Sequence, residues 1–65
     1  MVTVTTENGI GIYVANGTTL TTGTTVLNVK NGGTGVYIDQ GTANLGTTGS
    51  LTFNFSSGGG IGSIQ

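Results

Sequence analysis

A ten-residue pattern that occurs twice in the chain constrains its fold more than any other feature. It reads Gly-Ile-Gly-Ile-Tyr-Val-Ala-Asn-Gly-Thr at residues 9–18 and Gly-Thr-Gly-Val-Tyr-Ile-Asp-Gln-Gly-Thr at residues 33–42. Five of the ten positions are identical, and a partial copy, Gly-Ile-Gly, begins at residue 60. A period in the mid-twenties is typical of arrays in which each repeat is one supersecondary unit stacked on its neighbour. The sequence therefore predicts a repeat protein.

The composition of the repeats favours strands over helices. Glycine and threonine each supply 14 of the 65 residues, and proline is absent. Helix formers such as Ala, Glu, Lys and Gln are scarce, whereas β-branched residues are abundant. Apolar and polar residues alternate, most clearly where Leu51, Phe53 and Phe55 are separated by Thr52 and Asn54. Such alternation indicates strands with one buried face, and no window carries the apolar spacing of a helix.

Turn residues divide each repeat into three short strands. Asn8-Gly9 and Asn16-Gly17 favour turns because Asn and Gly adopt positive φ at little cost, and residues 31–33 and 40–41 repeat them. Three strands and three corners per cycle predict an all-β fold, a parallel β-helix (β-solenoid) of about 2.5 coils of 24–27 residues. We expect a single domain at residues 1–65, with coil 1 at about 1–25, coil 2 at about 26–50 and a partial coil 3 at about 51–65.

Equivalent residues of successive coils are expected to stack about 4.8 Å apart, as neighbouring strands do. The first corner is expected to have the same length in coils 1 and 3 and to be one residue shorter in coil 2. Ser63 then takes an inward position, and Ile64 falls in the column of Tyr13 and Tyr37. Either the register slips after Gly62 or the terminus is not native-like. The expected inward stacks are Val2/Leu27/Phe53, Val4/Val29/Phe55, Ile12/Val36 and Leu20/Leu45, and the expected outward stacks are Tyr13/Tyr37 and Asn28/Asn54.

Few groups in the chain suit catalysis or metal binding. Histidine and cysteine are absent, and the only charged residues are Glu7, Lys30 and Asp39. The two carboxylates fall on different corners, so they form no acid–base pair. Residues 32–38 nearly match the calcium-binding β-roll nonapeptide, but Tyr37 stands in the place of its aspartate. We predict no enzyme activity, no catalytic residue, no cofactor and no metal site.

Charge and hydropathy also limit the partners that we expect. A formal net charge of −1 provides no basic surface for nucleic acid. No apolar run reaches the roughly 18 residues that a membrane-spanning helix needs, so membrane insertion is not expected. Tyr13 and Tyr37 are the candidate contact residues, because an outward pair of aromatic rings can bind a glycan or a protein. The alternative is that this pair only tightens the ladder between coils.

Three segments of the sequence resemble repeats in the passenger domains of large bacterial autotransporter adhesins, most closely those of fusobacterial type. They are Gly-Ile-Gly-Ile-Tyr, Asn-Gly-Thr-Thr-Leu and Gly-Thr-Gly-Val-Tyr-Ile. The resemblance is one of repeat style and covers essentially the whole chain. It implies a right-handed β-helix stalk that is exported, displayed on the cell surface and used to present adhesive regions. The family's membrane barrel and signal peptide are absent from this sequence, so the resemblance implies a passenger fragment.

Our leading hypothesis is a structural segment of a cell-surface adhesin or fibre stalk, which is extracellular and whose parent protein contacts host-cell or bacterial surface molecules. We expect the chain to stack end to end with itself, because uncapped strands with few charges and no proline recruit further strands. One alternative is a self-assembling, amyloid-like β-solenoid fibril. A further alternative is a small binding module that uses the face of Tyr13 and Tyr37.

Overall fold

Eight β-strands and no helix make up the chain in the computed structural model, which describes all of residues 1–65. The strands are β1 (Val2–Glu7), β2 (Ile10–Val14), β3 (Thr19–Thr21), β4 (Thr25–Lys30), β5 (Gly33–Ile38), β6 (Thr42–Asn44), β7 (Leu51–Ser56) and β8 (Gly60–Ile64). The first repeat comprises β1 to β3, the second β4 to β6, and the third β7 and β8. The prediction of an all-β fold is confirmed.

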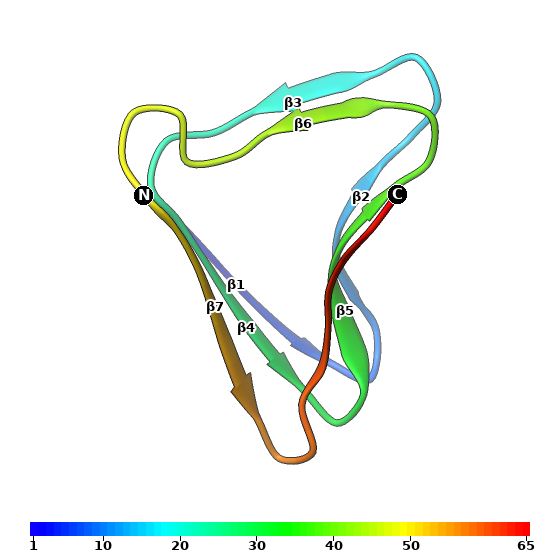
Figure 1. The fold of residues 1–65 in the computed structure, drawn as a ribbon, viewed down its shortest axis with the longest axis vertical. Helices are drawn as coiled ribbons and strands as arrows, with labels where there is room; N and C mark the ends of the chain where they lie inside the picture. The colour runs from blue at the N-terminus through cyan, green and yellow to red at the C-terminus, as the bar shows by residue number, and fades with distance from the viewer.

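Strands in equivalent places of successive repeats pair in parallel and form three sheets. Sheet 1 has the order β1-β4-β7, sheet 2 the order β2-β5-β8 and sheet 3 the order β3-β6. Figure 1 shows the three sheets along the three sides of a triangular outline. The repeats lie on top of one another along the shortest dimension of the molecule, which measures 12 Å. This thickness suits three strand layers about 4.8 Å apart.

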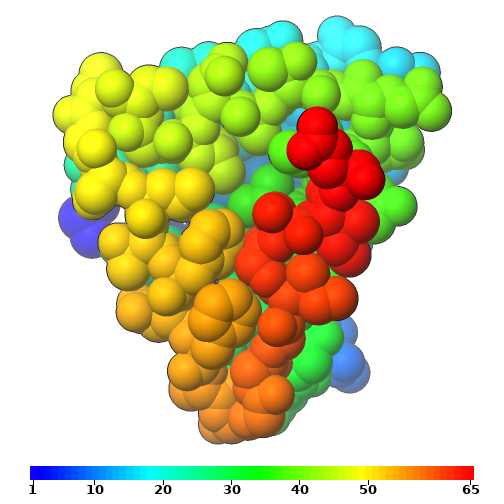
Figure 2. Space-filling view, in the orientation of Figure 1, coloured from blue at the N-terminus to red at the C-terminus, as the bar shows by residue number.

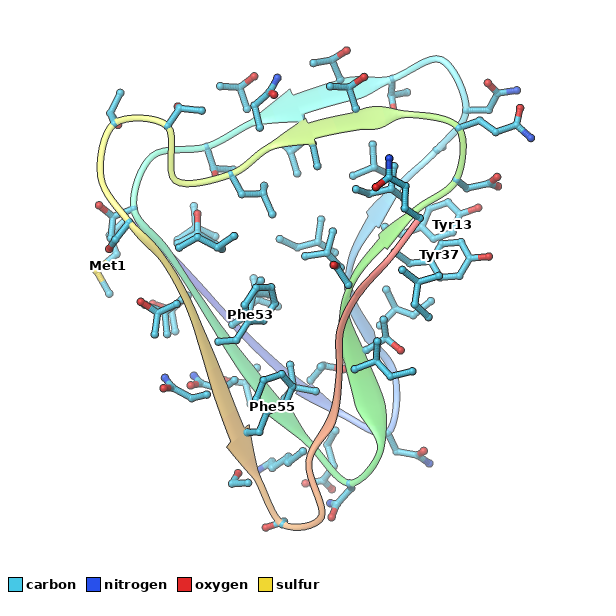
Figure 3. All side chains as sticks on the ribbon, viewed as in Figure 1. Met1, Tyr13, Tyr37, Phe53 and Phe55 are labelled. Atoms are coloured by element: carbon cyan, nitrogen blue, oxygen red, sulfur yellow. The ribbon has the colours of Figure 1, made fainter.

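A small hydrophobic core lies inside the triangle. Its centre consists of Leu27, Val29 and Val36, which are buried and belong to β4 and β5. These two strands have a neighbouring strand on both sides, so their inward side chains are covered from above and below. Figure 3 shows that the rings of Phe53 and Phe55 also point into the triangle. Partly buried side chains from every repeat surround the centre, namely Val4, Ile12, Ile38, Leu45 and Phe53.

The register of sheet 1 differs from the prediction in the first repeat. The inward stacks are Val4/Leu27/Phe53 and Thr6/Val29/Phe55, so the predicted stacks Val2/Leu27/Phe53 and Val4/Val29/Phe55 are wrong by two residues. Val2 instead pairs with Thr25. Because side chains alternate with a period of two, such a shift keeps the same residues inward. Thr6 therefore joins the core as a buried residue.

The corner between sheets 1 and 2 causes this shift, because its length grows from repeat to repeat. Residues 8–9, 31–33 and 57–60 separate the last paired row of sheet 1 from the Ile10/Thr34/Ile61 row of sheet 2. The equal lengths predicted for the first and third repeats are therefore wrong. Each corner begins with a residue in the left-handed region (Asn8, Asn31 and Ser57, with φ of 58°, 55° and 49°), and only glycines follow it. Glycine accepts unusual φ angles, so each added residue leaves the strand pairing intact.

Sheet 3 shows a similar shift, whereas the outward columns follow the prediction. Leu20 pairs with Ala43 rather than with Leu45, which lies beyond the end of β6, so the predicted Leu20/Leu45 stack is wrong. The inward stack Ile12/Val36 and the outward stacks Tyr13/Tyr37 and Asn28/Asn54 are confirmed.

The third repeat keeps the register of the second to its end. Ser63 pairs with Val36, and Ile64 pairs with Tyr37. No slip therefore follows Gly62, and a small polar side chain ends a column of aliphatic ones. Sheet 3 has no strand from the third repeat, so β6 lacks a neighbour on that side.

Candidate functional site

A column of three glycines in sheet 2, Gly11, Gly35 and Gly62, sets the direction in which the tyrosines point. A Cβ atom added to Gly35 would lie 2.6 Å from the carbonyl oxygen of Gly62 and 2.9 Å from Cε1 of Phe53. The backbone at Gly35 therefore faces the interior so closely that only glycine fits. The next residue, Val36, is also buried in the core. Two consecutive inward positions interrupt the alternation, and Tyr37 then emerges on the outer face.

Tyr13 and Tyr37 form a stacked pair on this outer face. They pair in the β2–β5 ladder, with ring centroids 5.5 Å apart and ring planes 9° from parallel. Figure 3 shows both rings pointing away from the interior on the same side of the triangle. One face of each ring is covered by the other ring. This arrangement favours a role in tightening the ladder over a flat platform for a ligand.

Asp39 is the third member of this outer site. The hydroxyl group of Tyr13 donates a hydrogen bond of 2.7 Å to Oδ2 of Asp39, which joins the first repeat to the second. This bond, together with the nearby negative charge, raises the pKa of Tyr13 above its ordinary value of 10.0. The sequence did not predict this contact. Its only signal is that Asp39 takes the place of Ala15 in the ten-residue pattern, two positions after the tyrosine.

The remaining charged groups are engaged in sheet 1. Nζ of Lys30 lies 3.5 Å from Oε2 of Glu7, its partner in the β1–β4 ladder; the Lys30 side chain is partly buried and that of Glu7 is largely exposed. Glu7 ends β1 in sheet 1, whereas Asp39 follows β5 in the corner between sheets 2 and 3. The chain contains no cluster of three or more His, Cys, Asp or Glu side chains arranged to hold a metal ion. Apart from the Tyr13–Asp39 hydrogen bond and the Lys30–Glu7 ion pair, the geometry brings no proton donor together with a carboxylate.

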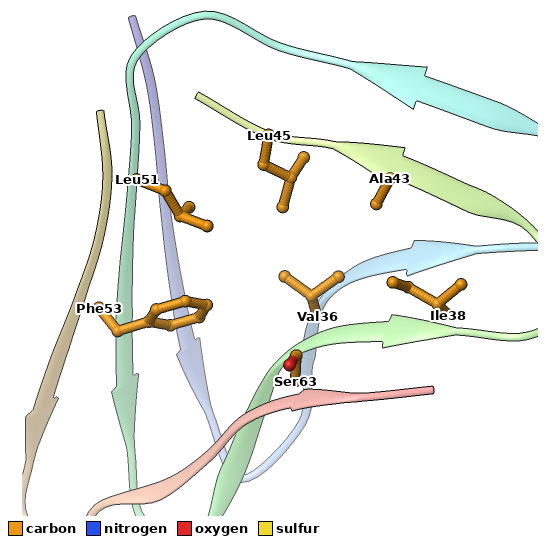
Figure 4. Close-up of a pocket in the computed structure, with 7 residues that line it drawn as sticks. All are labelled: Val36, Ile38, Ala43, Leu45, Leu51, Phe53 and Ser63. Atoms are coloured by element: carbon orange, nitrogen blue, oxygen red, sulfur yellow. The ribbon is translucent and has the colours of Figure 1, made fainter. Parts of the chain in front are cut away.

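A hollow opens at the end of the molecule formed by the third repeat. Its volume is about 230 Å³. The hollow exists because no strand of the third repeat extends sheet 3, so inward residues of the second repeat remain uncovered. Figure 2 shows residues of the second repeat in green between the orange and red segments of the third. Figure 4 shows the lining residues, which are Val36, Ile38, Ala43, Leu45, Leu51, Phe53 and Ser63.

Comparison with known proteins yields no relative. No protein-family model, no curated protein and no solved structure matches the chain. The structure also contains no helix with the length and hydropathy needed to cross a membrane.

Proposed function

We propose that the chain is a segment of a β-solenoid, in which each repeat forms one coil, and that it serves as a structural segment of a cell-surface adhesin or fibre stalk. The observation that carries this proposal is the parallel, in-register pairing of strands one repeat apart in all three sheets. The triangular outline in Figure 1 supports it. Each repeat of a solenoid contacts only its neighbours, so adding repeats lengthens a rod without changing its cross-section.

The outward side chains support a structural role rather than a chemical one, because they bond to equivalent places in the next repeat. Asn54 donates a side-chain hydrogen bond of 3.0 Å to Asn28, which in turn donates one of 3.3 Å to Thr5. Such polar ladders tie successive strands together. The Tyr13 bond to Asp39 acts in the same way on another side of the triangle. We infer that these groups hold coils together and act on no substrate.

An extracellular location at the bacterial surface belongs to the same proposal. It is supported by the resemblance of residues 9–13 and 33–38 to passenger-domain repeats of autotransporter adhesins. In that setting the segment extends a stalk, and the parent protein presents adhesive regions to host-cell or bacterial surface molecules.

We also infer that the 65-residue chain stacks end to end with copies of itself. Inward apolar side chains lie open at both end layers. Val2 is 38 % exposed at one end, and Leu51 and Phe55 are 41 % and 49 % exposed at the other. The outer edges of these layers have no strand partner. Proline and charged residues usually protect such edges, and the chain has no proline and only three charged residues. A second copy that covers them forms a head-to-tail contact, which does not close and therefore grows a filament.

A charge placed in the open end layer tests this stacking. Phe55→Lys puts an ammonium group where a second copy has to pack, whereas Thr52→Lys puts the same group on the outer face of the same strand. Sedimentation and electron micrographs should show concentration-dependent filaments for the unchanged chain and for Thr52→Lys. Folded monomers are expected for Phe55→Lys. An unchanged chain that stays folded and monomeric at high micromolar concentration contradicts the proposal.

The exposed edge strands also favour a second candidate, an amyloid-like fibril of β-solenoid chains. The two candidates differ in the stability of the single chain. Stacked stalk segments should dissociate on dilution into monomers that melt cooperatively. Amyloid-like fibrils should persist on dilution and bind thioflavin, because chains in such fibrils are held by continuous strand ladders and dry interfaces.

A further inference from the structure

We propose that Tyr13 and Tyr37 form an oxidative cross-linking site, at which one-electron oxidation joins their rings by a carbon–carbon bond. The bond connects β2 to β5 and therefore fastens the first repeat to the second. Nothing in the structural role described above requires this reaction. It rests on three properties of the pair: the stacking of the rings, the hydrogen bond to Asp39 and the scarcity of other oxidisable side chains.

The stacking of the rings suits the formation of this bond. When two phenoxyl radicals couple, the new bond forms between ring carbons next to the hydroxyl-bearing carbon, through π orbitals perpendicular to the rings. The rings of Tyr13 and Tyr37 are 9° from parallel with centroids 5.5 Å apart, so these orbitals face each other. The β2–β5 ladder holds both Cα atoms in register, and outward side chains retain enough rotamer freedom to close the remaining distance.

Asp39 assists the first oxidation by taking a proton. A neutral phenol loses an electron far more readily when its proton leaves at the same time. The Tyr13 hydroxyl already donates to Oδ2 of Asp39 at 2.7 Å, which gives that proton a carboxylate acceptor. Tyr13 is 54 % exposed, so an external oxidant reaches it. Asp39 therefore acts as a proton acceptor beside the reacting ring.

The composition directs oxidation to this pair. The chain has no cysteine, tryptophan or histidine, and its only methionine is Met1, at the chain terminus. Tyr13 and Tyr37 are the only two tyrosines. Ile64 occupies the next place in their column, so the column offers no third ring for coupling. In a head-to-tail stack, the same isoleucine layer separates Tyr37 from the tyrosines of the next copy. The expected product is a link within one chain.

The reaction balances with hydrogen peroxide as the oxidant and a haem peroxidase as the catalyst. Each phenol gives up one electron and one proton. One peroxide molecule takes up the two electrons and two protons and becomes two water molecules. The two radicals then form the carbon–carbon bond. Each newly bonded ring carbon loses its hydrogen while the ring oxygen regains one, which restores two phenols. The chain loses two hydrogen atoms in total.

The single basic residue of the chain, Lys30, allows proteolysis to show whether the cross-link joins the two tyrosines of one chain. A lysine-specific protease cuts after Lys30, which lies between the two tyrosines, and therefore separates residues 1–30 from 31–65. After peroxidase treatment of the dilute folded chain, we expect dityrosine fluorescence in the monomer fraction, a mass two hydrogens lower, and fragments that stay joined after cleavage. Cross-linked product found only in dimers or larger species overturns the proposal.

Three controls separate the roles of the fold, the rings and the carboxylate. Tyr37→Phe should abolish the link between fragments. Urea-unfolded chain at the same concentration should give a several-fold lower yield, because the rings are no longer held together. Asp39→Asn should leave the circular dichroism spectrum unchanged and slow cross-linking several-fold, while Asp39→Glu restores part of the rate. Equal yields from folded and unfolded chain, or an equal rate for Asp39→Asn, contradict the assignment.

Discussion

Strands β4 and β7 lie side by side in sheet 1 and alternate apolar and polar residues in the same way, yet they are buried to very different degrees. Leu27 and Val29 of β4 are 0 % exposed, whereas the larger Phe55 of β7 is 49 % exposed. The difference is in their neighbours, since β4 lies between β1 and β7, and β7 is paired only with β4. In this architecture, burial depends on the layers above and below a strand more than on its own hydropathy.

Sheet 2 repeats the contrast within one column. Val36 in β5 is buried, and its partner Ser63 in β8 is exposed beside the hollow. In sheets 1 and 2 the second repeat is therefore the only one covered on both sides, and the third repeat acts mainly as its cover. Stability should be concentrated in β4 and β5, and equivalent substitutions in the two repeats should have unequal effects.

The largest expected effect comes from a charge in the middle layer. Val29→Asp places a carboxylate in the centre of the core, which costs several kcal/mol unless the group is neutralised. A chain of 65 residues has a total stability of roughly 3–10 kcal/mol, so this variant should be unfolded. Phe55→Asp, in the same column, should remain folded at low concentration because water reaches the new carboxylate. Circular dichroism checks both, and equal loss of β signal contradicts the contrast between the repeats.

Truncation to alanine should lower stability less than a buried charge does. The loss should be greater for Leu27, the smaller side chain, than for Phe55. Leu27→Ala leaves a cavity in a fully covered layer and should lower the free energy of unfolding by about 2–5 kcal/mol. Phe55→Ala removes a larger but half-exposed ring and should cost about 1 kcal/mol or less in the monomer. Urea titration at low micromolar concentration measures both. A greater loss for Phe55→Ala is the result that refutes this order.

The outward columns could be predicted from the sequence because their residues are distinctive. Tyr13 and Tyr37 are the only tyrosines, and Asn28 and Asn54 both follow an apolar residue in a strand, so each pair marks its own register. The inward columns could not be placed in this way. Apolar residues two positions apart are interchangeable by hydropathy, because both point to the same face. The alternation of apolar and polar residues therefore fits Val2 and Val4 equally well to the Leu27 column.

Corner length decided between those registers, and hydropathy says nothing about it. The corner after β1, β4 and β7 gains one glycine in each repeat, and glycine turns leave no periodic signal. The contact between Tyr13 and Asp39 also lay beyond the pattern, because it joins an outward strand residue to a corner residue of the next repeat. The hollow depends on how many strands reach each sheet, and that number follows only once the corners are placed.

The glycine column of sheet 2 extends the comparison between repeats to the backbone. Gly35→Ala brings a methyl group within 2.6 Å of the Gly62 carbonyl oxygen and should destabilise the chain by about 1–3 kcal/mol. At Gly62 the nearest atoms to an added Cβ are ring carbons of Phe55 and Phe53, at 3.7 and 3.8 Å, which is ordinary contact. Gly62→Ala should therefore leave the melting temperature nearly unchanged. Similar losses from both variants would show that the third repeat packs as tightly as the second.

The smallest expected effect concerns the outer face, where the first repeat is tied to the second by a titratable bond. The Tyr13 hydroxyl donates to Asp39, whereas the Tyr37 hydroxyl makes no hydrogen bond within the chain. The bond raises the pKa of Tyr13 above its ordinary value of 10.0. A group whose pKa is higher in the folded state contributes its full stability below the ordinary value and loses it as pH rises through the folded value. Stability should therefore fall as pH increases beyond about 10.

The decrease in the free energy of unfolding with rising pH should be reduced more by Tyr13→Phe than by Tyr37→Phe. Urea titrations of the three chains between neutral pH and pH 11 test the difference, and identical slopes for the two variants would mean that the Asp39 contact does not discriminate between the rings.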